Sequence, residues 1–306
     1  MAADSHPGCV TVFGGSGFLG REIVKRLLAE GITVRLAARR PDRAAIGEAP
    51  GRGGRLQPVY ADLRDATSVA LALEGTEAAV DAVGLYVETG AETLEAVHEL
   101  GASNVAHQAA TLGLDRLVHI SGIGADPRSE SRYVRVRAEG ERRVMEAFPQ
   151  ATVLRPSVLF GPQDSFVNAL AGIARRTPLL PLFGRGRTRL QPVFLGDVAE
   201  AALGALAHPD APGRTYELGG PRVYSYRALV TLVLERAGRR RLLLPVPFPV
   251  WLALAVLASF LPAPPLTRAQ VVLMKRDNVV AEDALTLGDL GIEATALEAV
   301  LPDYAF

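Results

Sequence analysis

The stretch that decides the fold is GGSGFLG, residues Gly14 to Gly20, which follows the apolar run Cys9 to Phe13 and leads into a helical pattern. Its glycines are spaced G-x-x-G-x-x-G. In a strand, turn and helix unit, Gly14 permits the tight turn, Gly17 lets the backbone approach a pyrophosphate, and Gly20 lets the helix pack close to the sheet. The helix N-terminus then offers unpaired N–H groups to the phosphates. The motif therefore predicts a dinucleotide site.

Segments typical of strands and helices alternate through the first half of the chain. Apolar runs rich in β-branched residues predict strands at Cys9 to Phe13, Thr33 to Ala37, Gln57 to Tyr60, Ala78 to Val83, Arg116 to Ile120 and Thr152 to Leu154. Helical patterns lie between most of them, at Phe18 to Ala29, Ala66 to Leu73, Glu92 to Leu112 and Tyr133 to Ala147. This alternation predicts an α/β fold with a doubly wound parallel sheet of the Rossmann type.

Proline becomes frequent after Leu154, and the regular alternation weakens. We expect residues 1–160 to form the dinucleotide-binding domain, with 190–220 returning to it. Residues 161–189 and 221–306 are expected to form a smaller, Pro-rich C-terminal lobe that carries substrate or partner specificity.

Composition excludes several classes of function. The chain has 306 residues, 49% of them hydrophobic, with 33 basic and 33 acidic side chains. No overall charge favours nucleic acid, so none is expected as a partner. A single cysteine, Cys9, and histidines without ligand spacing predict no disulfide framework and no metal site. The N-terminal MAADSHPG has no basic start and no apolar core, so we expect a cytoplasmic protein.

The residues at the end of the second predicted strand favour NADP(H) over NAD(H). An NAD site usually carries an acidic residue there, but this chain reads Ala37, Ala38, Arg39, Arg40. Arginine side chains can bind a 2′-phosphate with charge-assisted hydrogen bonds. The alternative is a pair of solvated loop arginines. Asp62, in the sequence YADLRD, is placed either to meet the adenine or to cap the next helix.

These motifs together resemble those of the extended and atypical short-chain dehydrogenase/reductases. The resemblance rests on GGSGFLG, ADLRD, the strand ending HIS at Ser121, Tyr133, and LRPSVLFGP from Leu154 to Pro162. It implies cofactor contacts by Gly14, Ser16, Gly17, Phe18, Leu19, Gly20, Arg39, Arg40, Asp62, Leu63, Val83, Gly84, Tyr133, Arg137, Pro156 and Ser157.

Within that superfamily the chain is most similar to the alpha-subcomplex subunit nine family of respiratory complex I and its bacterial relatives. LRPSVLFGPQDSFVN, LPAPPLTRAQVVLMKRDNVV and LGIEATALEAVLPDY carry this similarity into the C-terminal lobe. It implies a tightly held NADPH and an accessory role in complex I, another membrane-associated complex or quinone-related metabolism.

The residues expected around the nicotinamide leave catalysis open. A tyrosine can act as acid or base beside a carbinol oxygen if a neighbouring cation lowers its pKa from ~10. Tyr133 and Arg137 share one helix face, and Ser121 could hydrogen-bond the substrate oxygen. The family has lysine where this chain has Arg137, and a guanidinium does not replace a slim ammonium. Either Tyr133 is the acid/base, or the pair is a wall around a cofactor that does not turn over.

An apolar segment runs from Leu242 to Leu261, directly after three arginines. Its uninterrupted helical part, Val250 to Leu261, is too short to span a bilayer, and Pro245, Pro247 and Pro249 would break a longer helix. A buried helix, a partner-binding face and a peripheral membrane contact at the inner face of the membrane remain alternatives.

Arginines also gather in FGRGRTRLQ, at Arg185, Arg187 and Arg189. Extended family members bind the phosphates of nucleotide sugars in this region, and Arg189 is the residue aligned with that role. Solvated loop arginines are the alternative.

Two functions follow from these observations. The first is an NADP(H)-binding protein whose cofactor is structural or redox-sensing. The second is an NADP-dependent oxidoreductase, or a nucleotide-sugar epimerase or dehydratase, that uses Tyr133.

Overall fold

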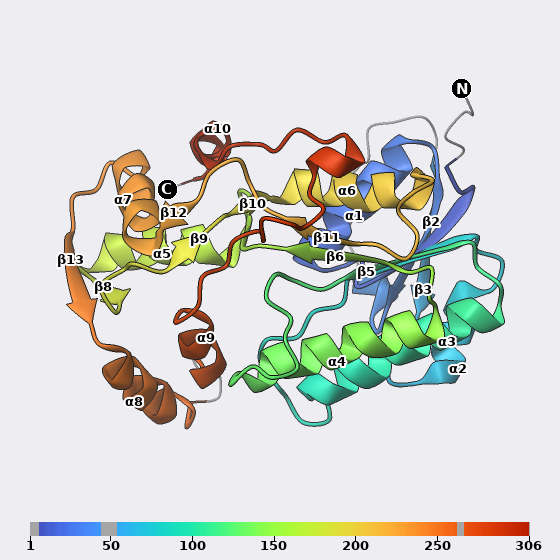
Figure 1. Ribbon diagram of the computed structural model, residues 1–306, viewed down its shortest axis with the longest axis horizontal. Coiled ribbons are helices and arrows are strands. Elements are labelled where there is room, and N and C mark those ends of the chain that lie inside the picture. Colours follow the sequence, from blue (N-terminus) through green and yellow to red (C-terminus); the bar gives the residue numbers. More distant parts are fainter. Residues whose placement is uncertain (1–5, 44–53, 262–265, 306) are drawn as a thin grey trace.

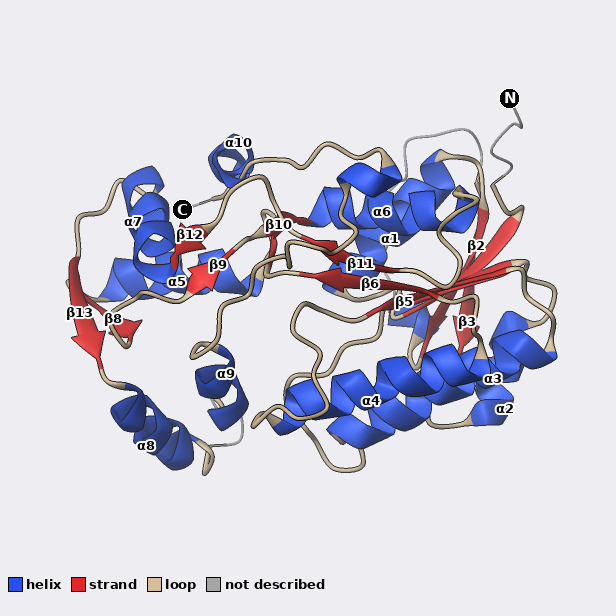
Figure 2. Cartoon of the chain, in the orientation of Figure 1, coloured by secondary structure: helices blue, strands red, loops and turns tan. Residues whose placement is uncertain are grey.

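A seven-stranded parallel sheet forms the centre of the protein (Figures 1 and 2). The computed structural model describes residues 6–43, 54–261 and 266–305. The strands lie in the order β11-β6-β5-β4-β1-β2-β3. Their bounds are β1 (Cys9–Phe13), β2 (Thr33–Ala38), β3 (Leu56–Tyr60), β4 (Ala78–Asp81), β5 (Arg116–Ile120), β6 (Thr152–Pro156) and β11 (Thr215–Leu218). The predicted doubly wound Rossmann-type fold is confirmed.

Helices cover both faces of this sheet (Figure 1). One face carries α1 (Phe18–Ala29) and α6 (Leu195–Ala207), and the other carries α2 (Ala66–Leu73), α3 (Ala102–Thr111) and α4 (Arg132–Ala147). Because the sheet is covered on both sides, its central strands are almost entirely buried, and most of their residues are apolar. In α1, Ile23, Val24, Leu27 and Leu28 recur at helical spacing and are buried against the sheet.

The order of the strands places a ligand crevice at the end of β1. After β1 the chain builds β2 and β3 on one side, then crosses to β4 on the other. Loops that leave the carboxyl ends of β1 and β4 therefore diverge, which opens a crevice between them. The glycine-rich turn lies at this point.

One predicted helix differs from the structure. The segment Glu92 to Leu112 was expected to be a single α-helix, but it begins as a π-helix (Glu95–Gly101) that continues into α3. The wider turn brings the backbone close to its neighbours: a Cβ on Gly101 would lie 2.8 Å from the Leu63 Cβ. A π-helical segment depends on packing against other elements, so the pattern of apolar residues in the sequence does not predict it.

The remaining elements form a second lobe with its own apolar core, built mainly from α5, α7 and β8. It contains β8 (Leu179–Phe183) paired in parallel with β13 (Leu242–Val246). Its helices are α5 (Ser165–Arg176), α7 (Tyr226–Arg236), α8 (Phe248–Ala258), α9 (Arg268–Leu273) and α10 (Leu297–Val300). Short strands β7 (Leu159–Phe160), β9 (Arg189–Leu190), β10 (Val193–Phe194) and β12 (Tyr224–Ser225) connect the two parts.

The apolar segment near the C-terminus is a strand followed by an exposed helix. The structure differs from one expectation about this segment and excludes one of the alternatives left open for it. Helix α8 begins at Phe248 rather than at Val250, because Pro249 lies in the first turn, where proline removes no intrahelical hydrogen bond. The helix is also not buried in the lobe, since Ala255 is its only buried residue. No helix within the described residues has the length and apolar character needed to cross a bilayer.

The chain returns to the main sheet twice after it enters the second lobe. Strand β11 pairs with β6, and α6 packs beside α1. Further on, Leu285 and Leu287 pack on the core beneath α1 and α6, and the Asp197 carboxylate accepts hydrogen bonds from Thr295. The exact division into domains stays a prediction, and residues 1–5, 44–53, 262–265 and 306 of the predicted ranges lie outside the described residues.

Candidate cofactor site

The glycine-rich turn leaves no room for side chains at its key positions. Gly14 has a φ of 75°, a left-handed conformation that favours glycine, and its Cβ would lie 2.8 Å from the Ala82 carbonyl oxygen. A Cβ on Gly20 would lie only 2.1 Å from the Gly14 carbonyl oxygen. The Gly17 N–H donates to that same oxygen at 2.8 Å. The backbone is thus packed against itself, as a pyrophosphate-binding turn requires.

A cleft of about 310 Å³ opens in front of this turn. Eight of the predicted cofactor residues line it: Gly14, Ser16, Gly17, Arg39, Asp62, Leu63, Val83 and Gly84. A Cβ added to Gly84 would have no other atom within 4 Å, so the cleft is open at this residue. The described residues therefore fit a dinucleotide at its adenosine and pyrophosphate end.

The other predicted cofactor residues do not line this cleft. Phe18 and Leu19 begin α1 and pack with the core, and Gly20 sets the approach of the helix to the turn. Arg40 is exposed. Pro156 ends β6, and the Ser157 hydroxyl is hydrogen-bonded to Asn278 of the C-terminal segment.

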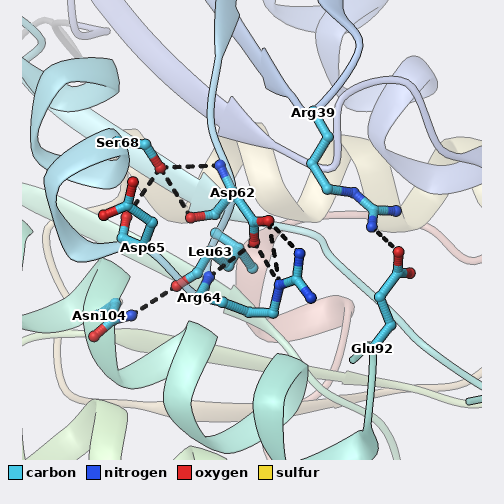
Figure 3. Close-up of polar contacts among 8 residues, drawn as sticks. All are labelled: Arg39, Asp62, Leu63, Arg64, Asp65, Ser68, Glu92 and Asn104. Atoms are coloured by element: carbon cyan, nitrogen blue, oxygen red, sulfur yellow. Dashed lines mark hydrogen bonds and ion pairs between the residues drawn. The ribbon is translucent and has the colours of Figure 1, made fainter. Parts of the chain in front are cut away.

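Two arginine–carboxylate pairs line the cleft (Figure 3). Arg39 forms an ion pair with Glu92, and Arg64 binds the Asp62 carboxylate through Nε at 2.9 Å. These hydrogen bonds from Arg64 lower the pKa of Asp62, which keeps it ionised. Sequence reasoning missed Glu92 and Arg64 as lining residues. Arg64 could have been found, because it lies two residues after Asp62 in the same turn.

The structure shows whether Asp62 caps the helix that follows it. The N-cap of α2 is Asp65, whose carboxylate accepts a hydrogen bond from the Thr67 N–H at 3.0 Å. The Asp62 carboxylate instead accepts from the Arg64 N–H at 3.0 Å (Figure 3), and Asp62 is one of the residues that line the cleft. Asp62 is therefore not the N-cap of α2, and its carboxylate is bound by Arg64.

Tyr133, Arg137 and Ser121 come together beyond this cleft. Arg137 donates to the Tyr133 hydroxyl at 3.4 Å and to the Ser121 hydroxyl at 3.3 Å. A Cβ on Gly122 would lie 2.1 Å from the Arg137 guanidinium, so the glycine makes room for the arginine. Leu85 lines the cleft and also packs against the Tyr133 cluster, which connects the two regions.

The surroundings of Tyr133 keep its phenol protonated. Its ring stacks on Tyr86 with centroids 5.2 Å apart and meets the His98 ring edge-on at 5.6 Å. Ala269 and Leu273 of α9 pack over the same cluster. Burial raises the pKa of Tyr133 well above its usual range, although the Arg137 guanidinium acts in the opposite direction.

A second buried polar pair lies next to Ser121. His119 Nδ1 and an Asp81 carboxylate oxygen are 3.0 Å apart at the ends of β5 and β4, and both residues are buried. Within the described residues, no group of three or more histidine, cysteine or acidic side chains could hold a metal ion. The pair is therefore an internal link between two central strands.

Known proteins are similar to this chain over most of its length. A family described as "NAD(P)H-binding" matches residues 14–165. The mitochondrial NADH dehydrogenase [ubiquinone] 1 alpha subcomplex subunit 9 of Arabidopsis thaliana is 31% identical over 92% of this chain and 73% of its own length. The mouse (Mus musculus) protein of the same name is 31% identical over 94% of this chain and 77% of its own length.

Solved structures agree on the fold. The triphenylmethane reductase of Citrobacter sp., complexed with NADP(H), superposes with a TM-score of 0.75 at 17% identity, over 96% of this chain and 99% of that one. This likeness extends through both the sheet domain and the second lobe. The chain therefore belongs to the family of complex I alpha subcomplex subunit 9 proteins, and its residues 14–165 match a family described as NAD(P)H-binding.

Proposed function

We propose that this protein binds NADP(H) and holds it as a structural or redox-sensing group, as an accessory to respiratory complex I or to quinone-related metabolism. One observation carries the proposal: the similarity to complex I alpha subcomplex subunit 9 proteins over more than nine tenths of the chain. Tyr133 agrees with a cofactor that does not turn over, because its phenol is buried and burial raises its pKa. An acid/base at a carbinol carbon needs the opposite shift. Tyr133, Arg137 and Ser121 would then form the wall beside the nicotinamide, with Pro156 and Ser157 behind it.

The test is the ligand of the protein purified from its native source. We expect NADPH to be present, to exchange slowly, and to accompany complex I subunits. An empty, solitary protein that exchanges its cofactor readily would contradict the proposal. If the protein bound its partner equally well with NADPH and with NADP⁺ in the site, a redox-sensing role would be excluded and the structural role would remain.

The preference for NADP(H) rests on the arginines of the cleft. Arg39 and Arg64 both line it, each beside one carboxylate, and a 2′-phosphate would take the place of Glu92 at Arg39. Arg39→Ala should weaken NADPH binding by roughly tenfold or more, the loss of one hydrogen bond to a charged group. NADH binding should change little. Arg40→Ala is the matched control, because Arg40 is next to Arg39 in the chain but does not line the cleft.

Calorimetric titration with both nucleotides separates these outcomes. Equal losses for NADPH and NADH in Arg39→Ala would show that Arg39 does not read the 2′-phosphate. If Arg40→Ala weakened NADPH binding as much as Arg39→Ala does, both arginines would contribute to the binding of the 2′-phosphate.

The second candidate is an NADP-dependent oxidoreductase, or a nucleotide-sugar epimerase or dehydratase. It is favoured by the hydroxyls of Tyr133 and Ser121, which both lie within hydrogen-bonding reach of one guanidinium. It predicts a substrate-dependent change in NADPH absorbance that Tyr133→Phe abolishes while NADPH still binds. Turnover that survives Tyr133→Phe would exclude this mechanism.

A further inference from the structure

Helix α8 presents an apolar surface that nothing in the described chain covers. From Leu242 to Thr267 the sequence has no charged side chain. In α8 and the turn after it, Leu257 is 66% exposed, Phe260 83% and Leu261 53%. Val250 and Leu254 are each 46% exposed. An apolar surface of this continuity is unusual in contact with water and indicates an interaction site.

The opposite side of α8 is fixed to the second lobe. The Trp251 indole N–H donates to the Leu182 carbonyl at 3.1 Å, and its ring lies 4.4 Å from that of Phe183. Phe183 in turn contacts Tyr226 at the start of α7. The helix therefore holds its apolar face outward at the end of the molecule far from the N-terminus (Figure 1).

A basic cavity of about 470 Å³ lies beside the start of α8. Arg185, Arg187 and Arg227 line it together with Gly186, Ser225 and Pro245, and no carboxylate is among its lining residues. Its position follows from the backbone: Pro245 is three residues before Phe248, and the Gly184 N–H donates to the Val246 carbonyl at 2.8 Å. The cavity therefore lies close to the start of α8.

In the part of the chain that the structure describes, these three arginines lack the carboxylate partner that the neighbouring Arg189 has. Arg189, next in the same loop, pairs with Asp277 at 2.7 Å, whereas no ion pair is found for Arg185, Arg187 or Arg227 within the described residues. Three cations without carboxylate partners repel one another, which an anion would relieve. Phosphate is the anion that a set of guanidinium groups binds best.

We propose that α8 and this arginine cavity dock the protein on the surface of an anionic phospholipid bilayer. The lipid phosphates occupy the cavity of Arg185, Arg187 and Arg227, and the exposed side chains of α8 enter the acyl boundary. Charge complementarity selects this partner, because an apolar helix beside clustered arginines is the arrangement that binds anionic interfaces. The docking goes beyond the proposed cofactor role and does not depend on it.

The experiment is co-sedimentation of the full, cofactor-loaded protein with vesicles. We expect binding to phosphatidylcholine vesicles that contain phosphatidylglycerol, weakened by salt, and little binding to pure phosphatidylcholine. Changing all three arginines to glutamine should reduce binding by roughly fivefold for each charge removed. Leu257→Ser with Phe260→Ser should reduce it by about tenfold or more.

Matched variants control for general effects. Arg175→Gln with Arg176→Gln removes two exposed cations from α5 of the same lobe, and Leu71→Ser removes an exposed leucine from α2. Both should bind vesicles as the wild type does. Bound NADPH, measured on every variant, reports on the fold and on the cofactor site separately from lipid binding.

Two results would overturn the proposal. One is equal binding to neutral and anionic vesicles, or no binding, by a protein that retains its cofactor. The other is a stable dimer or complex with another subunit that Leu257→Ser with Phe260→Ser dissociates, since a protein would then cover the α8 surface.

Discussion

The lack of a side chain at Gly20 allows α1 to pack tightly against the glycine-rich turn. A Cβ on Gly20 would meet the Gly14 carbonyl oxygen at 2.1 Å, and that oxygen belongs to the backbone of the turn, which cannot rotate away as a side chain can. We expect Gly20→Ala to lower the free energy of unfolding by about 1–3 kcal/mol, as overpacking does, and to abolish NADPH binding. Denaturant titration and calorimetry measure the two effects.

Gly204→Ala is the control for Gly20→Ala. Gly204 lies in α6, packed beside α1, and a Cβ there would meet nothing within 4 Å. Because alanine is the better helix former, this variant should be more stable by roughly 0.5–1 kcal/mol and should bind NADPH normally. Equal behaviour of the two variants would show that close packing at Gly20 is unimportant.

The burial of His98 should make the free energy of unfolding decrease in acid. Burial lowers its pKa to about 4, so the folded protein holds the neutral ring. The unfolded chain takes up a proton near pH ~6.5. The stability is therefore complete above about pH 6.5 and falls as the pH decreases toward about 4, by on the order of 2–3 kcal/mol.

His98→Gln removes this titration. Denaturant titrations across the acid range should give the variant a smaller loss of unfolding free energy than the wild type. His107→Gln, at an exposed position on α3, should behave as the wild type does. Parallel pH profiles for wild type and His98→Gln would contradict the assignment.

At the scale of elements, α9 covers the Tyr133 cluster although it has only six residues. Such a short helix depends on its capping box. The Thr267 hydroxyl accepts from the Gln270 N–H at 3.2 Å, and the Gln270 side chain accepts from the Thr267 N–H at 2.9 Å. The α9 helix is thus the element through which the second lobe closes over Tyr133.

Thr267→Ala should loosen this cover. Loss of an N-cap costs about 1 kcal/mol, which corresponds to roughly fivefold faster amide exchange in α9 and in the residues under it. Hydrogen exchange measured by mass spectrometry tests this. Thr267→Ser retains the hydroxyl and should exchange as the wild type does; similar rates for the alanine and serine variants would argue against the capping box.

At the scale of the whole molecule, the C-terminus is tied to the passage between the sheet and the second lobe. The Tyr304 hydroxyl donates to the buried Asp164 carboxylate and accepts from the Gly161 N–H at 2.8 Å. Asp164 also caps α5 by accepting from the Val167 N–H at 2.6 Å. One hydroxyl therefore connects residues more than a hundred positions apart.

Tyr304→Phe should lower the free energy of unfolding by about 1–3 kcal/mol, because it removes a hydrogen bond to a buried charged group. Denaturant titration provides the value. Tyr60→Phe, at an exposed position on β3, should have almost no effect. A loss of the same size in both variants would mean that the Tyr304 hydroxyl contributes nothing particular.

The sequence by itself determined the sheet domain. Phe18–Ala29 and Ala66–Leu73 are helices with the predicted bounds, and Cys9–Phe13 is the predicted strand, because local periodicity and the glycine turn act over a few residues. Family membership is likewise carried by motifs that are contiguous in the chain.

Only the tertiary structure decided which side chains share the cleft and which face α8 presents. Glu92 meets Arg39 across 53 positions, and burial sets the protonation of Tyr133. Neither can be read from spacing, since each depends on how distant segments pack. The same holds for α8: its composition is that of a core helix, and only the packing of Trp251 on Phe183 turns the rest outward.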